Sequence, residues 1–189
     1  MSAPEAGVSL AACPLDIIEL AARRGAAGAL GDAAARRGLM LAPLGQRRIF
    51  AAGLTLCIRP GRWLVLSPPA EVGQAALRWQ RDCAGSGTAV DLSSALKGLY
   101  LCGAAMRELL ARGCRVNLAP GAFAADGAAA TLIAQVSVIV AALPQGLLLL
   151  TPATTARHLY EWLIASGRPF GLRVHGNATV ERICEEGLA

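Results

Sequence analysis

A short alternating apolar run at 54–58 predicts a β-strand, and the apolar run at 63–66 predicts a second strand. Between them, Arg59-Pro60-Gly61-Arg62 contains the residues of a tight turn, so the two strands should form a hairpin. Ser67-Pro68 follows at once, and a hydroxyl residue before proline is typical of a helix N-terminus. The pattern therefore predicts a helix that runs to about Arg81.

The same order of elements recurs 84 residues further along the chain. Leu64-Val65-Leu66-Ser67-Pro68 aligns with Leu148-Leu149-Leu150-Thr151-Pro152 at that offset. Each predicted helix has a tryptophan late in its length, Trp79 in the first and Trp162 in the second, and with Trp63 these are the expected anchors of the core. Two hairpin–helix units indicate an α+β fold, an antiparallel sheet with covering helices.

The remaining periodicity places further elements around these two units. The pattern predicts helices at 14–24, 29–37 and 103–112, loops at 39–52 and 117–128, and strands at 90–93, 96–102, 132–142, 147–150 and 170–174. No element is predicted after His175. The chain then divides into an N-terminal helical segment (1–27), an α+β domain (28–174) and a C-terminal tail (175–189).

The composition favours a well-packed protein that assembles with a partner. Hydrophobic residues make up 54% of the chain and charged residues only 16%, against roughly 25% charged residues in an average domain. Part of so weakly charged a surface is expected to be covered by another protein. The six cysteines form no C-x-x-C pair, and neither a signal peptide nor an uninterrupted membrane-spanning run is visible. We expect reduced cysteines, no membrane contact and a cytoplasmic location.

The positive charge is concentrated in one quarter of the chain. Residues 21–62 hold eight arginines and one aspartate, a net charge of +7, whereas residues 63–189 have a net charge of +1. We expect an acidic partner surface to be bound by four of these arginines: Arg36, Arg37, Arg47 and Arg48. The alternative is a solvated face of helices and loop. Nucleic acid is disfavoured as a partner, because stacking aromatic residues are nearly absent from this segment.

The chain lacks the residue patterns of common catalytic and metal sites. It contains no G-x-S-x-G, G-x-G-x-x-G or G-K-[ST] sequence, and His158 and His175 are too far apart for a metal pair on one helix. We therefore expect no catalytic residue and no metal site. Asp91 is the acidic residue of most interest, because it lies next to apolar residues on a predicted strand. Its candidate roles are to cap a turn, to pair with an arginine or to bind a ligand.

The segment 89–114 resembles a known family. Val90-Asp91-Leu92-Ser93, Leu99-Tyr100-Leu101-Cys102-Gly103 and Glu108-Leu109-Leu110-Ala111-Arg112-Gly113-Cys114 are similar to motifs of the gamma subunit of bacterial heterotetrameric sarcosine oxidase. Gly61-Arg62-Trp63-Leu64 and the stretches 131–138 and 158–163 are similar to further motifs of that family. The resemblance covers about residues 28–174 and implies the folate-binding-type α+β fold of the folate-dependent aminomethyltransferases, which are distant relatives.

The resemblance also implies a function. The family's complex oxidatively demethylates sarcosine to glycine and transfers the one-carbon unit to tetrahydrofolate, and this chain would be a non-catalytic structural subunit of such a complex. The implied partners are larger flavoprotein alpha and beta subunits and a small delta subunit. FAD, FMN, NAD and tetrahydrofolate are expected on those partners and no cofactor on this chain. The alternative is a stand-alone folate-binding or aminomethyltransferase-like protein, with Asp91 as the candidate acid near the pterin.

Overall fold

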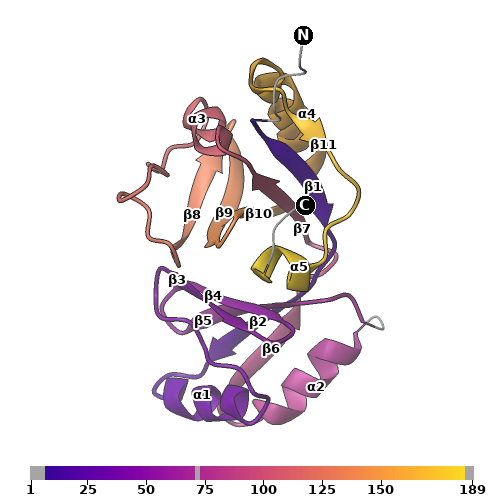
Figure 1. The fold of residues 1–189 in the computed structure, drawn as a ribbon. Helices are drawn as coiled ribbons and strands as arrows, with labels where there is room; N and C mark the ends of the chain where they lie inside the picture. The colour runs from indigo at the N-terminus through magenta and orange to yellow at the C-terminus, as the bar shows by residue number, and fades with distance from the viewer. Residues whose placement is uncertain (1–6, 71–72, 186–189) are drawn as a thin grey trace.

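Two mainly antiparallel sheets stack face to face, and helices cover their outer faces (Figure 1). The computed structural model describes residues 7–70 and 73–185. Sheet A has the spatial order β11-β1-β7-β10-β9-β8, with strands at Arg173–Val174, Ser9–Cys13, Leu96–Cys102, Gly146–Pro152, Val136–Leu143 and Ala128–Ile133. Sheet B has the order β3-β4-β5-β2-β6, with strands at Gln46–Phe50, Gly53–Arg59, Arg62–Ser67, Asp16–Ala22 and Gly87–Asp91.

Five α-helices and one short 3₁₀-helix are described. They are α1 (Ala27–Ala35), α2 (Gln74–Asp82), α3 (Met106–Ala111), α4 (Ala156–Gly167), α5 (Val180–Glu185) and the 3₁₀-helix η1 (Arg168–Phe170). In Figure 1, α1 and α2 lie below sheet B, α3 and α4 lie at the opposite end with sheet A, and α5 lies between. None of the described helices is long and apolar enough to cross a membrane.

The two sheets are built from one pattern that is used twice. The units β1-β2-α1-β3-β4-β5-α2 and β6-β7-α3-β8-β9-β10-α4 have the same order of elements. Within the sheets, the order β3-β4-β5-β2-β6 corresponds to β8-β9-β10-β7-β1. The first strand of each unit therefore lies in the sheet of the other unit, and this exchange ties the two halves together. The predicted α+β class and the internal repeat are confirmed.

Three apolar layers hold the sandwich together. The layer between the sheets includes Ile17, Leu56 and Tyr100, which is among the largest fully buried side chains. An aliphatic layer joins the outer face of sheet A to α3 and α4, and an alanine-rich layer joins sheet B to α1 and α2. Trp79 is buried in this last layer, as predicted, whereas Trp63 and Trp162 are only partly buried.

The predicted helix at 14–24 is wrong, and so is the helical character of segment 1–27. This segment instead supplies β1 to sheet A and β2 to sheet B. Ile17 and Ile18 are both buried, because β2 has the second sheet on one face and helices on the other. A strand that is covered on both faces shows no period-two alternation, so its apolar run is hard to distinguish from that of a helix.

Two other predictions fail because the turn or the contact leaves little trace in the sequence. The strand predicted at 132–142 is two strands, β8 and β9, joined at Ala134 and Gln135 with φ angles of 51° and 65°. Such positive φ values usually coincide with Gly or Asn, which are missing here. The tail 175–189, expected to have no element, contains α5, whose Val180, Ile183 and Cys184 are buried between the sheets.

The loop predicted at 39–52 and the two predicted helix caps also need correction. β3 lies inside that loop and forms the edge of sheet B. Ser67 and Thr151 lie at the ends of β5 and β10, and α2 and α4 begin several residues later without a side-chain cap. The physical reason is that a residue before proline favours extended backbone, which suits the end of a strand.

Candidate functional site

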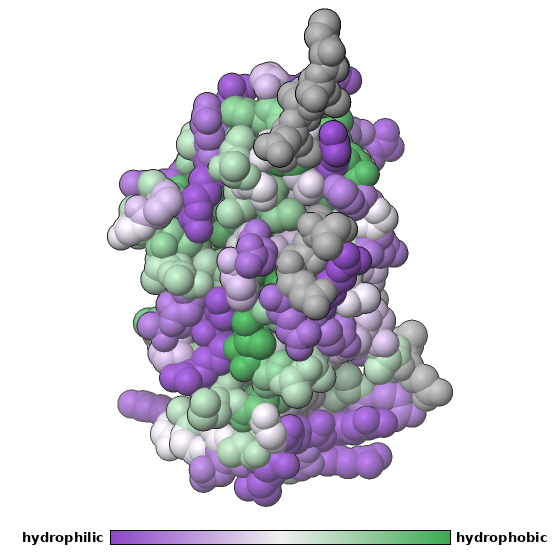
Figure 2. Space-filling model, in the orientation of Figure 1, coloured by the Kyte–Doolittle hydropathy of each residue, from purple (hydrophilic) through white to green (hydrophobic). Residues whose placement is uncertain are grey.

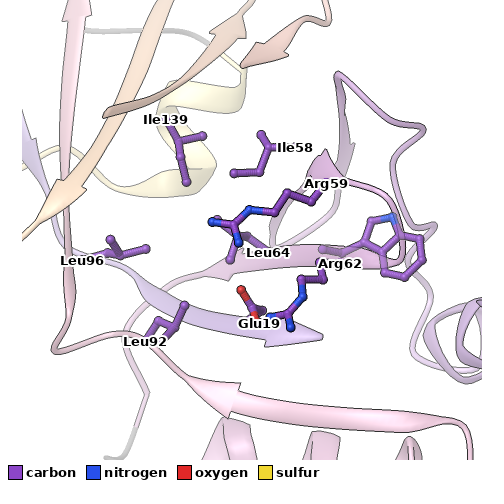
Figure 3. A pocket seen from close by; sticks show the side chains of 9 residues that line it. Glu19, Ile58, Arg59, Arg62, Leu64, Leu92, Leu96 and Ile139 are labelled. Atoms are coloured by element: carbon purple, nitrogen blue, oxygen red, sulfur yellow. Dashed lines mark hydrogen bonds and ion pairs between the residues drawn. The ribbon is translucent and has the colours of Figure 1, made fainter. Parts of the chain in front are cut away.

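An apolar cavity of about 180 Å³ opens at one end of the layer between the sheets. Figure 3 shows how its walls come from separate parts of the chain, with Ile139 on β9 of sheet A facing residues of sheet B and of the β6–β7 connection. The aliphatic lining residues are Ile58, Leu64, Leu92, Leu96 and Ile139. Because these side chains also pack on the inter-sheet core, the cavity is the end of that core that remains open.

A charged pair lies on the wall of this cavity. Glu19 on β2 accepts a hydrogen bond from Arg62 on β5, with 2.6 Å between Oε1 and Nη1. Both side chains lie on the face of sheet B that looks towards sheet A, since Glu19 is ladder-paired with Leu64, two residues from Arg62. The side chains are 23% and 51% exposed, and such pairs contribute about 0–1 kcal/mol to stability. The pair mainly gives an apolar cavity one polar wall.

Arg59 supplies a second cation. Figure 3 shows its guanidinium reaching into the cavity from the end of β4, and among the described residues it has no hydrogen-bond or ion-pair partner. A neighbouring cavity of about 250 Å³ shares Ile58, Arg59, Leu96 and Ile139 with the first. The two cavities therefore adjoin along these four residues, and we call them together the groove.

Most side chains that line the groove are apolar, and its charged groups are Glu19, Arg59 and Arg62. Its lining residues include no histidine and no cysteine, and its carboxylate is already paired with Arg62. The thiols of the inter-sheet layer are poor nucleophiles, because burial raises the pKa of Cys13 to about 12 and that of Cys184 to about 11. Across the described residues, no three His, Cys, Asp or Glu side chains gather in a way that could hold a metal ion.

Asp91 lies outside the lining of both cavities. Its exposed carboxylate accepts hydrogen bonds from the backbone N–H and the hydroxyl of Ser93, at 2.9 and 2.6 Å. Ser93 Oγ accepts a further hydrogen bond from the N–H of Ile17 at 3.0 Å. Of the three roles considered for Asp91, the structure shows the turn-capping one, and a contact with folate stays a prediction.

Glu19 is the cavity carboxylate that the sequence interpretation misses. The cause is the mistaken helix at 14–24, which separates Glu19 from the hairpin that holds Arg62. The available signal was a single acid inside an otherwise apolar run. The pairing of β2 with β5 is a long-range contact, and nothing local in the sequence specifies it.

The four arginines predicted to bind a partner have different environments. Arg37, just after α1, forms an ion pair with Asp82 and lies over the ring of Trp79, 4.6 Å from Cζ to the ring centroid. Arg47 on β3 donates hydrogen bonds to the carbonyl oxygens of Ala142 and Ala125, the second at 3.2 Å. Burial lowers the pKa of the Arg47 guanidinium. Arg37 and Arg47 therefore hold parts of this chain together.

Arg36 and Arg48 complete this set, and both are exposed. In the regions that the structure describes, neither guanidinium has a partner. These two side chains are thus available to an acidic surface, and binding of a partner by the set stays a prediction.

Solved structures identify the class of fold. A chain of heterotetrameric sarcosine oxidase from Corynebacterium sp. U-96, solved with pyrrole 2-carboxylate, matches with a TM-score of 0.77 and 25% sequence identity, over 89% of this chain and 88% of that chain. Aminomethyltransferase T of the glycine cleavage system from Bartonella henselae matches with a TM-score of 0.67 and 18% identity, over 97% of this chain and 52% of that one. No family model and no curated protein sequence matches this chain.

The chain therefore has the fold that is shared by these two proteins, and it is structurally related to the sarcosine oxidase family. It spans nearly the whole length of the matched sarcosine oxidase chain but only about half of the aminomethyltransferase.

Proposed function

We propose that this chain is a non-catalytic structural subunit of a complex that oxidatively demethylates sarcosine to glycine and transfers the one-carbon unit to tetrahydrofolate. The observation that carries the proposal is the match over 88% of one chain of a heterotetrameric sarcosine oxidase. The motifs at 89–114 that resemble the gamma subunit support the same assignment.

The site chemistry agrees with a supporting role. The groove between the sheets offers binding surfaces and no activated nucleophile in its lining. In the proposed complex, FAD, FMN and NAD would be bound by larger alpha and beta subunits, tetrahydrofolate would also be bound by a partner, and a small delta subunit would complete the assembly. This chain would contribute to assembly through its arginine-rich segment 21–62.

Co-expression with the genes that adjoin its own gene tests the proposal. A tag on this chain should recover the larger subunits in fixed stoichiometry, and the purified complex should consume oxygen when sarcosine is added. Light scattering during size-exclusion chromatography measures the mass of the assembly. Recovery of the chain alone, as a folded protein that ignores these partners, would contradict the proposal.

A second candidate function is folate binding by the isolated chain, and the groove at Arg59 is the observation that favours it. A pterin ring would pack against Leu64, Leu92 and Ile139, and the carboxylates of the folate tail would meet Arg59. Each cavity is smaller than the roughly 300–1,000 Å³ of a typical ligand site, so a folate would have to occupy both. The subunit role is therefore the better supported function.

Titration of the isolated chain with tetrahydrofolate, followed by calorimetry, tests this candidate. Binding that is weakened by Arg59→Gln and unchanged by Arg78→Gln, an exposed arginine on α2, would support folate in the groove. The affinity of Asp91→Ala then shows whether Asp91, the acid that the sequence suggests, contributes to folate binding in addition to the groove. No binding to the wild-type chain would remove this candidate.

A further inference from the structure

The outer edges of the two sheets differ in how well they are shielded. The β8 edge of sheet A is covered at its two ends, because Arg115 N donates to Leu132 O and Ala134 N donates to Gly113 O, both at 3.1 Å, and Ala128 N donates to Gly45 O at 2.8 Å. At the other edge of sheet A, the short β11 pairs with β1. The β6 edge of sheet B lies against α2, with Gln80 Nε2 3.4 Å from Ala89 O. Exposed strand edges are templates for pairing with another chain, so shielding matters.

The β3 edge of sheet B is open beyond its first residues. Arg47 N donates to Asp126 O at 2.7 Å, which shows that the backbone groups of Arg47 point away from β4. In an antiparallel ladder, alternate residues point the same way, so Ile49 also directs its N–H and C=O away from β4. Within the described ranges 7–70 and 73–185, neither group has a hydrogen-bond partner. The side chain of Ile49 is 39% exposed.

Exposed apolar side chains occur beside this edge. Met40 and Leu44 are 62% and 58% exposed. The Met40 carbonyl accepts a hydrogen bond from Thr55 Oγ1 at 2.9 Å, and Thr55 is the ladder partner of Arg48. Loop and strand thus form one surface, which we call the β3 edge surface: Met40, Leu44, Arg48 and Ile49. Figure 2 shows hydrophilic side chains gathered over the β3 side of sheet B with apolar area beside them.

Charge indicates which occupant fits the β3 edge surface. No acidic residue occurs between Asp32 and Glu71 in the sequence. The carboxylate of Asp126, in the neighbouring loop, interacts electrostatically with Arg47. A second copy paired through the same edge would bring two arginine-rich strands together, and such repulsion is destabilising. An extended acidic segment of another protein supplies both the missing hydrogen bonds and the counter-charge.

We propose that the β3 edge surface receives an extended, acidic segment of a partner subunit. The segment pairs as an additional strand with the outward N–H and C=O of Ile49 and places a carboxylate near Arg48. Met40 and Leu44 provide the apolar contacts around this strand. The inference deepens the proposed subunit role and rests on it.

Two variants test the edge directly. Ile49→Pro removes the outward N–H and leaves the ladder with β4 intact, because proline is tolerated where the N–H faces away from the neighbouring strand. Arg48→Glu reverses the charge at an exposed position. We expect each variant to bind the co-expressed flavoprotein partner at least tenfold more weakly in a surface-immobilised binding assay. Leu77→Gln and Arg78→Glu, exposed positions on α2, are matched controls that should bind as the wild type does.

Each outcome decides something different. Unchanged affinity of the folded variants would overturn the edge proposal and leave the subunit role intact, whereas a wild-type chain that forms no complex would overturn both. A wild-type homodimer that Ile49→Pro dissociates would show that the occupant is a second copy and would also overturn the proposal. Arg48→Glu keeps the test decisive if Ile49→Pro lowers the melting temperature, because the Arg48 side chain is exposed and has no hydrogen-bond or ion-pair partner among the described residues.

Discussion

The halves around sheet A and sheet B share one strand order but differ in how their outer faces are packed. Sheet A is covered through fully buried leucines such as Leu109, Leu159 and Leu163. Sheet B is covered through small residues together with Leu30 of α1 and Trp79 of α2. Because hydrophobic stabilisation scales with the apolar area removed from water, we expect the sheet A half to contribute more to stability. The sheet B half has the basic segment 21–62 and the open β3 edge, so we expect the two copies of one pattern to have different uses.

The largest expected effect distinguishes the anchors of the two halves. Trp79→Ala should lower the free energy of unfolding by about 3–5 kcal/mol, because it removes a large buried side chain and leaves a cavity in the sheet B layer. Trp162→Ala should cost only about 1–2 kcal/mol, since Trp162 is partly exposed on α4. Urea unfolding followed by circular dichroism measures both. Equal costs would contradict the asymmetry of the two outer layers.

The layer between the sheets belongs to both halves, and alkaline pH should weaken it. Burial raises the pKa of Cys13 from 9.0 to about 12, so the folded state keeps a proton that the unfolded state loses above pH 9. The stabilisation is complete below pH 9 and is lost as the pH rises from 9 to 12. At pH 10.5 this amounts to about 2 kcal/mol for Cys13.

Urea unfolding at pH 8 and pH 10.5 measures this loss, and Cys13→Ala should reduce the difference between the two pH values. Because the layer joins the halves, tryptophan fluorescence and circular dichroism should report one coincident transition. Two separate transitions would mean that the halves unfold independently.

Two neighbouring arginines on β3 should behave differently. Arg47→Gln removes the hydrogen bonds that reach Ala142 and Ala125 across the sheets, and hydrogen bonds of charged groups contribute about 1.5–3 kcal/mol. We expect Arg47→Gln to cost about 1–2 kcal/mol. Arg48→Gln should change stability by less than about 0.5 kcal/mol, as is usual for exposed substitutions. Thermal unfolding of the pair measures the difference, and a stable Arg47→Gln protein would show that Arg47 is a surface residue after all.

The smallest effect is expected at the β8–β9 turn. Ala134 has a φ of 51°, a conformation that costs L-residues roughly 1–2 kcal/mol and that glycine adopts freely. Ala134→Gly should therefore raise the free energy of unfolding by about 0.5–1 kcal/mol. Ala29→Gly, at an exposed position within α1, should instead lower it by about 0.5–1 kcal/mol. A destabilised Ala134→Gly protein would contradict the strain assigned to this turn.

Elements with local signals could be predicted from the sequence. The hairpin of β4 and β5 follows from its turn residues, with Gly61 at a φ of 71°. The strand predicted at 96–102 coincides with β7, and the helix predicted at 29–37 overlaps α1. The repeat of Leu64–Pro68 at 148–152 identified two equivalent units, although its hydroxyl-proline pair marks the exit of a strand rather than the start of a helix.

Features that depend on long-range packing could not be predicted. β2 has no alternation because both of its faces are covered, and α5 is a six-residue helix whose buried face is defined by its contact with the sheets. The groove exists because the stacking of the two sheets brings Ile139 of sheet A over Leu64 of sheet B. Glu19 and Arg59 are therefore not predictable as cavity residues from the sequence, whereas Asp91, the candidate that the sequence suggests, serves as a turn cap.

Hydrogen–deuterium exchange of this chain, free and in complex with its co-expressed flavoprotein partners, tests the central claim most directly. We predict that amide protection gained in the complex falls on residues 40–51, around the outward N–H of Ile49, and that β8 at 128–133, the edge strand of sheet A, exchanges equally in both states. A complex that gains protection along sheet A and none at residues 40–51 would contradict the account. A chain that gains no protection anywhere because it forms no complex would contradict its proposed role as a subunit.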